Sequence, residues 1–156
     1  MSADPLSIAA IEERTDQLIA FDDGALREAA PALSAELLAM GEHVLEAWLV
    51  AHGKVPTQGR QEGFRLLALH RQGARGDPSF NACRETCREI VYHHNVIRLD
   101  PAAEGVAGRI RLGAMVVRHL ALFVGGKLEV AGLGEFCCSS RGLRMTEAKA
   151  PPSRTA

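Results

Sequence analysis

The chain has 156 residues, of which 47% are hydrophobic and 24% are charged, and its formal net charge is −1. This is the size of one ordinary domain with a single core, which argues against a second independent domain. No segment has the length and apolarity of a membrane span or the pattern of a signal peptide, so we expect a cytoplasmic protein with no membrane contact. Thiols stay reduced in that compartment, so we expect the four cysteines to be free thiols or metal ligands and not disulfides: Cys83, Cys87, Cys137 and Cys138.

The charges are distributed unevenly along the chain. Residues 1–50 hold ten acidic residues and two arginines, net −8, whereas residues 51–156 have a net charge of +7. Such a chain can pair its own two halves, or pair head to tail with a second copy. A nucleic-acid surface would combine a dense basic face with exposed aromatic residues, but most of the seven aromatic residues sit in apolar stretches. We therefore expect a protein partner or a homo-oligomer, and no nucleic acid.

Six helices are predicted before residue 125, because apolar residues recur there at helical spacing. In chain order they cover 6–21, 25–30, 31–52, 61–72, the segment from 78 to the turn at 100, and 102–124. An acidic cap and a following proline mark two of the starts, at Asp77 with Pro78 and at Asp100 with Pro101. The last helix is apolar nearly all round and contains several glycines, which predicts the central helix of a bundle.

The pattern changes after the last predicted helix. Residues 127–130 alternate between polar and apolar, which predicts a short strand or hairpin lying on the bundle. The tail over 146–156 has no core-forming residues and is predicted to be disordered. The predicted fold is therefore mainly α, a single-domain bundle of five to six helices over 1–145, with a short C-terminal strand or hairpin and a disordered tail.

The stretch FNACRETCREIVYHHN, over 80–95, combines two cysteines with two histidines. On a helical wheel Cys83, Cys87 and His94 share one buried stripe, and His93 points away from it. The two cysteines are about 6 Å apart along the axis and can bind one ion, but His94 lies about 10.5 Å beyond Cys87. Cysteines that simply fill the core are the favoured interpretation, ahead of a metal site and of a reactive thiol pair.

A metal site would need further ligands from outside this stretch. His70, His119 and Cys137 supply that pool, and inward histidines of a helical bundle can also hold haem. The favoured alternative is that the rings of His70, His94 and His119 each donate to a carbonyl or carboxylate in the core. Two polar strips would resemble a di-metal box if they faced each other, although solvated helix faces are the commoner arrangement: Glu42, His43 and Glu46, and Glu85, Glu89 and His93.

A third group of residues surrounds the loop before the predicted fifth helix. Arg71 and Arg75 precede it, and Asn81 follows its first turn, so an anion can bind between these arginines, His70 and the helix N-terminus. The alternative is that Asp77 caps the helix and that both arginines are solvated.

Three functions remain open from the residues alone. The leading expectation is a small cytoplasmic accessory or regulatory protein that acts by binding a protein partner. The first alternative is a protein that binds a transition metal or haem through inward cysteines and histidines. The second is a small enzyme or binder of an anionic ligand at residues 70–81, for which no catalytic nucleophile is identified.

Overall fold

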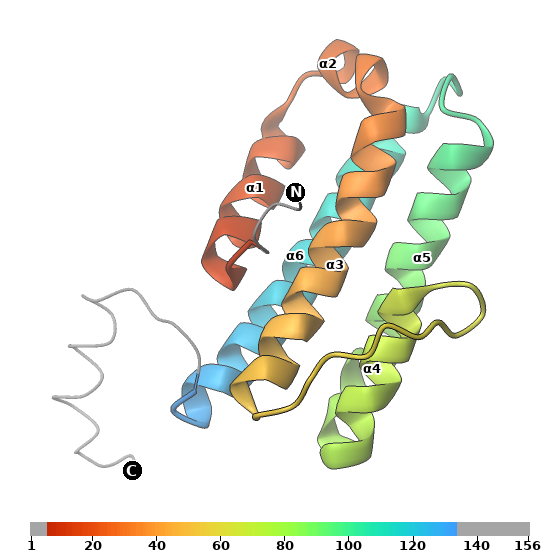
Figure 1. Ribbon diagram of the computed structural model, residues 1–156. Helices are drawn as coiled ribbons and strands as arrows, with labels where there is room; N and C mark the ends of the chain where they lie inside the picture. The colour runs from red at the N-terminus through yellow and green to blue at the C-terminus, as the bar shows by residue number, and fades with distance from the viewer. Residues whose placement is uncertain (1–5, 134–156) are drawn as a thin grey trace, which may run out of the picture.

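The computed structural model describes residues 6–133 of the chain. These residues form six α-helices and one short 3-10 helix, and no strand occurs among them, so the predicted mainly α class is confirmed (Figure 1). The elements in chain order are α1 (Ile8–Ala20), α2 (Asp23–Glu28), α3 (Ala30–Ala51), α4 (Arg65–Gly76), η1 (Pro78–Cys83), α5 (Arg84–Leu99) and α6 (Val106–Val130).

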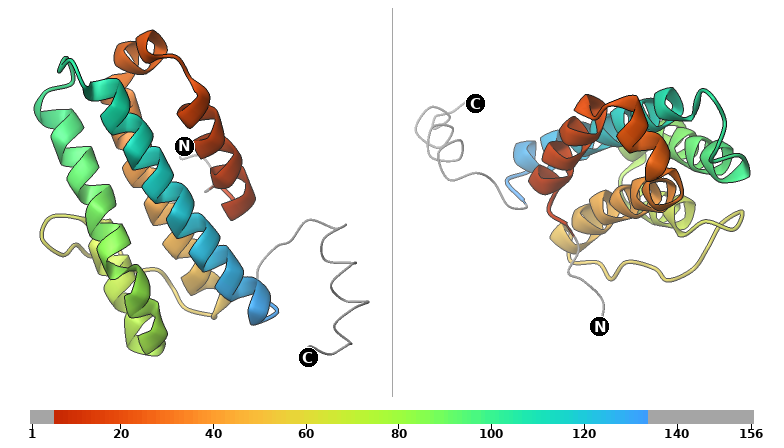
Figure 2. Two further views of the ribbon diagram at one scale, coloured as in Figure 1. Left: turned by 180° about the vertical axis from the view of Figure 1, so that it is seen from behind. Right: turned by 90° about the horizontal axis from the view of Figure 1, so that it is seen from above.

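The long helix α6 organises the packing. It contacts α1, α2, α3 and α5, while α3 also packs against α4 and α5. Seen from behind, α6 lies between α1 and α5, with α3 in the layer beyond it (Figure 2). The prediction of a central last helix is therefore confirmed, although one side of α6 faces outward. None of the helices in the described part of the chain is long and apolar enough to cross a membrane.

Local signals in the sequence explain where several helices begin and end. Asp22 caps α2 by accepting a hydrogen bond from the backbone N–H of Ala25 (2.8 Å), and Asp77 accepts one from Ser79 at the start of η1 (3.0 Å). The third predicted helix is α3, and beyond its end Gly53 has a φ of 73°, a conformation that favours glycine.

The start of α4 and the region after it differ from the prediction. α4 begins at Arg65 because the preceding residues form a tight turn, closed by backbone hydrogen bonds between Gln61 and Phe64 of 3.1 and 3.0 Å. The predicted fifth helix is divided into η1 and α5. η1 holds Phe80 in the core, and a Cβ added to Gly73 of α4 would lie 2.8 Å from that ring. Glycine at position 73 therefore permits the close approach of α4 and η1.

The sixth helix lies later in the chain than predicted. Asp100 accepts a hydrogen bond from the backbone N–H of Ala102 (3.3 Å), but this closes a turn, and α6 begins only at Val106. The strand or hairpin predicted over 127–130 is wrong for these residues, because they form the last turn of α6. Helical spacing places Leu128 in the core, with 4% of its surface exposed. The rest of the predicted hairpin and the tail lie outside the described residues.

The acidic start of the chain pairs with basic residues of α6. Arg118 binds Asp16 of α1 (2.7 Å), and Arg111 binds Asp23 of α2 (2.6 Å). These ion pairs show that the chain pairs its own halves, one of the two arrangements expected from the charge asymmetry. The exposed pairs add little stability individually, and they lie on the sides of α6 that face α1 and α2.

Candidate functional site

Two adjoining pockets lie between α4, the loop that precedes it and the start of α5. Their volumes are about 210 and 330 Å³, and Gln61 and Arg71 line both of them. We call the two together the arginine groove. Its lining residues in chain order are Thr57, Gly59, Arg60, Gln61, Leu67, Ala68, His70, Arg71, Gln72, Ala74, Arg75, Asn81, Arg84 and Arg88.

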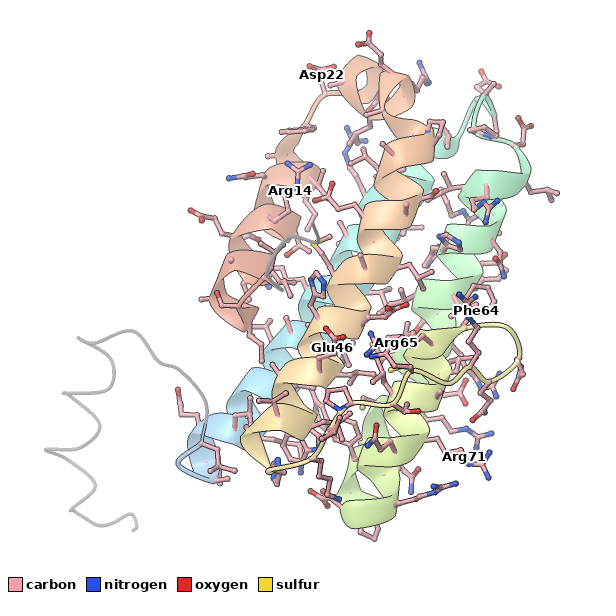
Figure 3. All side chains as sticks on the ribbon, in the orientation of Figure 1. Arg14, Asp22, Glu46, Phe64, Arg65 and Arg71 are labelled. Atoms are coloured by element: carbon pink, nitrogen blue, oxygen red, sulfur yellow. The ribbon has the colours of Figure 1, made fainter. Side chains whose placement is uncertain are left out.

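Five of these residues are arginines, and few carboxylates neutralise them. Arg88 forms an ion pair with Glu62 (2.8 Å), and Arg60 donates to the carbonyl of Gly63 (3.3 Å). Among residues 6–133, Arg71 and Arg75 form no ion pair or side-chain hydrogen bond, and both are exposed. Figure 3 shows Arg71 extending outward from α4. The groove therefore carries excess positive charge with unused donors.

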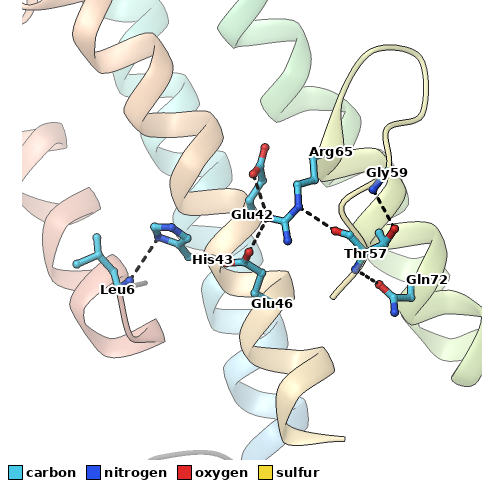
Figure 4. A network of polar contacts seen from close by, with 8 residues as sticks. All are labelled: Leu6, Glu42, His43, Glu46, Thr57, Gly59, Arg65 and Gln72. Atoms are coloured by element: carbon cyan, nitrogen blue, oxygen red, sulfur yellow. Dashed lines mark hydrogen bonds and ion pairs between the residues drawn. The ribbon is translucent and has the colours of Figure 1, made fainter. Parts of the chain in front are cut away.

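Hydrogen bonds hold the loop wall of the groove against α3 and α4. The side chain of Gln72 accepts from the backbone N–H of Thr57 (2.8 Å) and donates to the carbonyl of Val55 (2.9 Å). Arg65 donates to the carbonyl of Thr57 (2.9 Å) and also binds Glu46 of α3 (2.5 Å) (Figure 4). The loop is thus attached to two helices, which fixes the shape of the second pocket without a ligand.

Gln61 stands where the two pockets meet. Its side-chain oxygen Oε1 is buried and has no hydrogen-bond partner among the described residues. A buried acceptor without a partner costs about 1–3 kcal/mol, so a donor that reaches Oε1 after a small displacement of the Gln61 side chain stabilises the arrangement. The groove therefore offers several cationic donors, and one of its lining residues carries a buried acceptor that lacks a donor among the described residues.

His70 joins the groove to the two buried cysteines behind it. Its ring lines the first pocket and donates through Nε2 to the carbonyl of Phe80 (3.0 Å), and the thiol of Cys83 donates to the same oxygen (3.1 Å). Cys83 is 2% exposed and Cys87 is fully buried, so the prediction that both lie on the buried stripe of their segment is confirmed.

The cluster of His70, Cys83 and Cys87 has perturbed proton affinities. Hydrogen bonding with Cys87, and then with His70, outweighs burial and lowers the pKa of Cys83 to about 6. The pKa of Cys87 is raised by its hydrogen bond with Cys83 and by its own burial. Burial alone lowers the pKa of His70, but hydrogen bonds with Cys83 and with the Phe80 carbonyl raise it overall.

We therefore expect Cys83 to ionise at an unusually low pH. Because Cys83 is buried, its ionisation is followed by the ultraviolet absorbance of the thiolate, which should rise through a midpoint near pH 6, whereas an ordinary thiol titrates at about 8.5. The measurement is the difference in this absorbance between the wild-type protein and Cys83→Ala over a range of pH. Cys87→Ala should move the midpoint to higher pH, because the first hydrogen bond is lost. A wild-type midpoint at the ordinary value contradicts the assignment.

The other residues predicted as metal ligands lie apart from this cluster. His94 is buried and donates through Nδ1 to the carbonyl of Ser34 (2.8 Å), as expected for a core histidine. The inward position predicted for His119 is wrong, because α6 turns its other face to the core and leaves His119 exposed. Cys137 lies outside the described residues. Residues 6–133 contain no group of three or more histidine, cysteine, aspartate or glutamate side chains able to hold a metal ion.

His93 is buried, contrary to the prediction that it points away from the core. Only 6% of its surface is exposed, because Gly113 of α6 has no side chain and α5 approaches it closely; a Cβ on Gly113 would lie 3.5 Å from the Cβ of His93. Burial and then the charge of Arg109 lower the pKa of His93. The sequence pattern of α5 could not reveal this contact, because it depends on a glycine in another helix.

The two polar strips considered as a di-metal box do not face each other. Glu42 and Glu46 both bind Arg65, at 3.4 and 2.5 Å. His43 points to the other side of α3, where Nδ1 accepts from the backbone N–H of Leu6 (3.4 Å) (Figure 4). Glu85 and Glu89 of α5 are exposed. The two strips therefore do not form a shared site.

The predicted anion-binding residues come together in the arginine groove. Arg71 lines both pockets, Asn81 lines the first and Arg75 lines the second. Sequence reasoning missed Arg60, Gln61, Arg84 and Arg88 as part of the same site. The spacing of Arg84 and Arg88 places them on one flank of α5, but only the folded loop shows that this flank faces Arg71. Comparisons with protein-family models, curated proteins and solved structures find no significant match to this chain.

Proposed function

We propose that this protein binds a small anionic ligand in the arginine groove. The observation that carries the proposal is the excess of arginine over carboxylate around the two joined pockets, with Arg71 at their junction. Guanidinium groups bind phosphate and carboxylate through paired, charge-assisted hydrogen bonds, and such groups are the natural partners of unpaired arginines in a concave site.

The free acceptor of Gln61 narrows the class of ligand. If the Gln61 side chain turns toward the groove, a ligand that places a hydroxyl or amine beside its anionic group can donate to Oε1 while the anion binds Arg71. Phosphorylated or carboxylated metabolites with such a donor fit better than a bare inorganic anion, because they leave no buried acceptor unpaired. We expect the protein to be a cytoplasmic accessory or regulatory protein, a location supported by the free thiols of Cys83 and Cys87.

A panel of ligands tests the proposal by thermal shift and by titration calorimetry. The probes are phosphate, pyrophosphate, a sugar phosphate, a dicarboxylate and a hydroxy acid. A ligand at roughly 100 times its Kd stabilises the folded state by about 2.7 kcal/mol, and ligands with a hydroxyl donor should bind more tightly than those without one. No stabilisation by any member of the panel contradicts the proposal.

Two variants assign the binding to the groove. Arg71→Gln should weaken binding at least about tenfold, because it removes one charged donor from both pockets. Arg98→Gln is the matched control, since Arg98 is exposed near the end of α5 and does not line the groove. Gln61→Leu should remove the preference for hydroxyl-bearing ligands while leaving the affinity for phosphate nearly unchanged. Equal losses in Arg71→Gln and Arg98→Gln would place the ligand elsewhere.

A further inference from the structure

The outward face of α6 carries an uncharged stripe along nearly its whole length. Its members are all exposed and follow one another at intervals of three or four residues: Gly108, Leu112, Met115, His119, Leu122, Gly126 and Val130. The larger side chains are well exposed, 48% for Leu112, 53% for Met115 and 44% for Leu122. We call this set the α6 stripe.

The rest of the described chain leaves the α6 stripe uncovered. α1 and α5 flank α6 and α3 lies behind it, so the outward side meets no other helix (Figure 2, left). The intervals alternate between four and three residues from Gly108 to Gly126, followed by one more of four, and this alternation is the spacing of a coiled-coil seam, in which two helices pack at about +20°. The 22-residue rise from Gly108 to Val130 corresponds to about 33 Å, roughly three heptads. Scattered exposed apolar residues are ordinary, but a continuous seam is typical of a helix-packing surface.

We propose that a second copy of this chain packs antiparallel on the α6 stripe, related to the first by a two-fold axis near His119. In such an interface, residue i of one copy contacts residue j of the other, and j contacts i. Across this axis each large side chain at the ends of the stripe faces a glycine of the other copy, and the two medium-sized side chains near the centre face each other. Leu112 meets the partner's Gly126, Val130 meets the partner's Gly108, and Met115 meets the partner's Leu122.

Charge on both sides of the stripe favours a second copy. Arg111 and Arg118 flank the stripe on the α1 side, and each is already paired within the chain, with Asp23 and Asp16. On the α5 side the guanidinium of Arg109 lies over the ring of Tyr92, 5.5 Å from its centroid. The two arginines on the α1 side are paired with carboxylates before association, so two identical surfaces can meet there without unpaired like charges. A stripe whose positions match by size in its own copy, and whose α1 side carries paired charges, fits a second copy of the chain.

Sedimentation equilibrium of the full chain tests the proposal. The expected mass is twice the 16.8 kDa of one chain. Met115→Glu should weaken dimerisation at least about tenfold, because it places a charge at the centre of the seam. Val55→Glu is the matched control, since Val55 is 85% exposed in the loop before α4 and should leave the dimer unchanged. Circular dichroism should show the same helix content in every variant.

A paired substitution tests the antiparallel arrangement. Leu122→Lys alone should also weaken the dimer. The double variant Met115→Glu with Leu122→Lys should restore it, because each glutamate then meets the partner's lysine. In a parallel arrangement equal charges would meet, and the double variant would remain a monomer, which overturns the antiparallel pairing.

A wild-type chain that is monomeric at every concentration overturns the whole proposal, even if residues 134–156 or another partner cover the stripe. A wild-type dimer that Met115→Glu does not weaken assigns dimerisation to another surface.

Discussion

Phe80→Ala should lower the free energy of unfolding by about 3–5 kcal/mol, the range found when a buried phenylalanine is truncated. The Phe80 ring is fully buried. It stacks on Trp48 and His70, with ring centroids 4.9 and 5.5 Å away. Because Gly73 of α4 approaches this ring so closely, the site has little freedom to collapse around the cavity. Urea denaturation followed by circular dichroism measures the loss.

Phe21→Ala is the matched control for that measurement. It deletes the same side chain at a position where 38% of the residue surface is exposed. The expected loss is clearly smaller than for Phe80→Ala, because over a third of the Phe21 surface stays in contact with water in the folded state. Equal losses in the two variants would show that Phe80 does not hold the corner between α4, η1 and α3.

Arg65→Met should cost about 2–3 kcal/mol near neutral pH, somewhat less than the ~3–5 kcal/mol of a fully buried pair, because its partners keep some contact with water. The substitution removes the ion pairs with Glu42 and Glu46 and the hydrogen bond to the carbonyl of Thr57. Two glutamates one helical turn apart are then left without their cation, and the loop wall of the arginine groove loses its attachment to α3.

The cost of Arg65→Met should depend on pH. Burial raises the pKa of Glu42, and the charge of Arg65 opposes this, so the pKa rises further in the variant. A carboxyl with a raised pKa destabilises the folded state above that pKa, and protonation on acidification removes the penalty. The deficit should therefore shrink as the pH falls from neutral through the raised pKa of Glu42 toward the ordinary carboxyl value. Arg14→Met, which breaks one partly exposed pair with Glu36, is the control and should cost less than about 1 kcal/mol. A deficit independent of pH contradicts this account.

The helical fold could be predicted because its determinants are local. Apolar spacing within α1, α3 and α5 identified the buried faces, and Asp22, Asp77 and Pro31 marked helix starts that the structure also has. The end of α6 could not be predicted in the same way. The helix predicted over 102–124 ends just before Gly125 and Gly126, but α6 continues through them because the packing of Leu128 in the core outweighs their low helix propensity.

The candidate site could be predicted only in part. Arg71, Arg75 and Asn81 lie close together in the sequence, so their proximity followed from a short loop and a helix start. Arg60 and Arg84 come from the two segments on either side of α4, and only the tertiary fold brings both to the groove. The position of His93 depended likewise on the missing side chain of Gly113.

The pairing of α1 with α6 has a consequence for the order of events during synthesis. The 102 residues that separate Asp16 from Arg118 take about 5–20 s to translate at about 5–20 residues per second. Until α6 has left the ribosome, the apolar side of α1, including Ile11 and Leu18, lacks its main packing partner, and only α3, which touches α1 less extensively, can cover part of it. The first helix made therefore gains its main packing partner only when the last helix emerges, and during that interval much of its apolar face is available to chaperones that bind nascent chains.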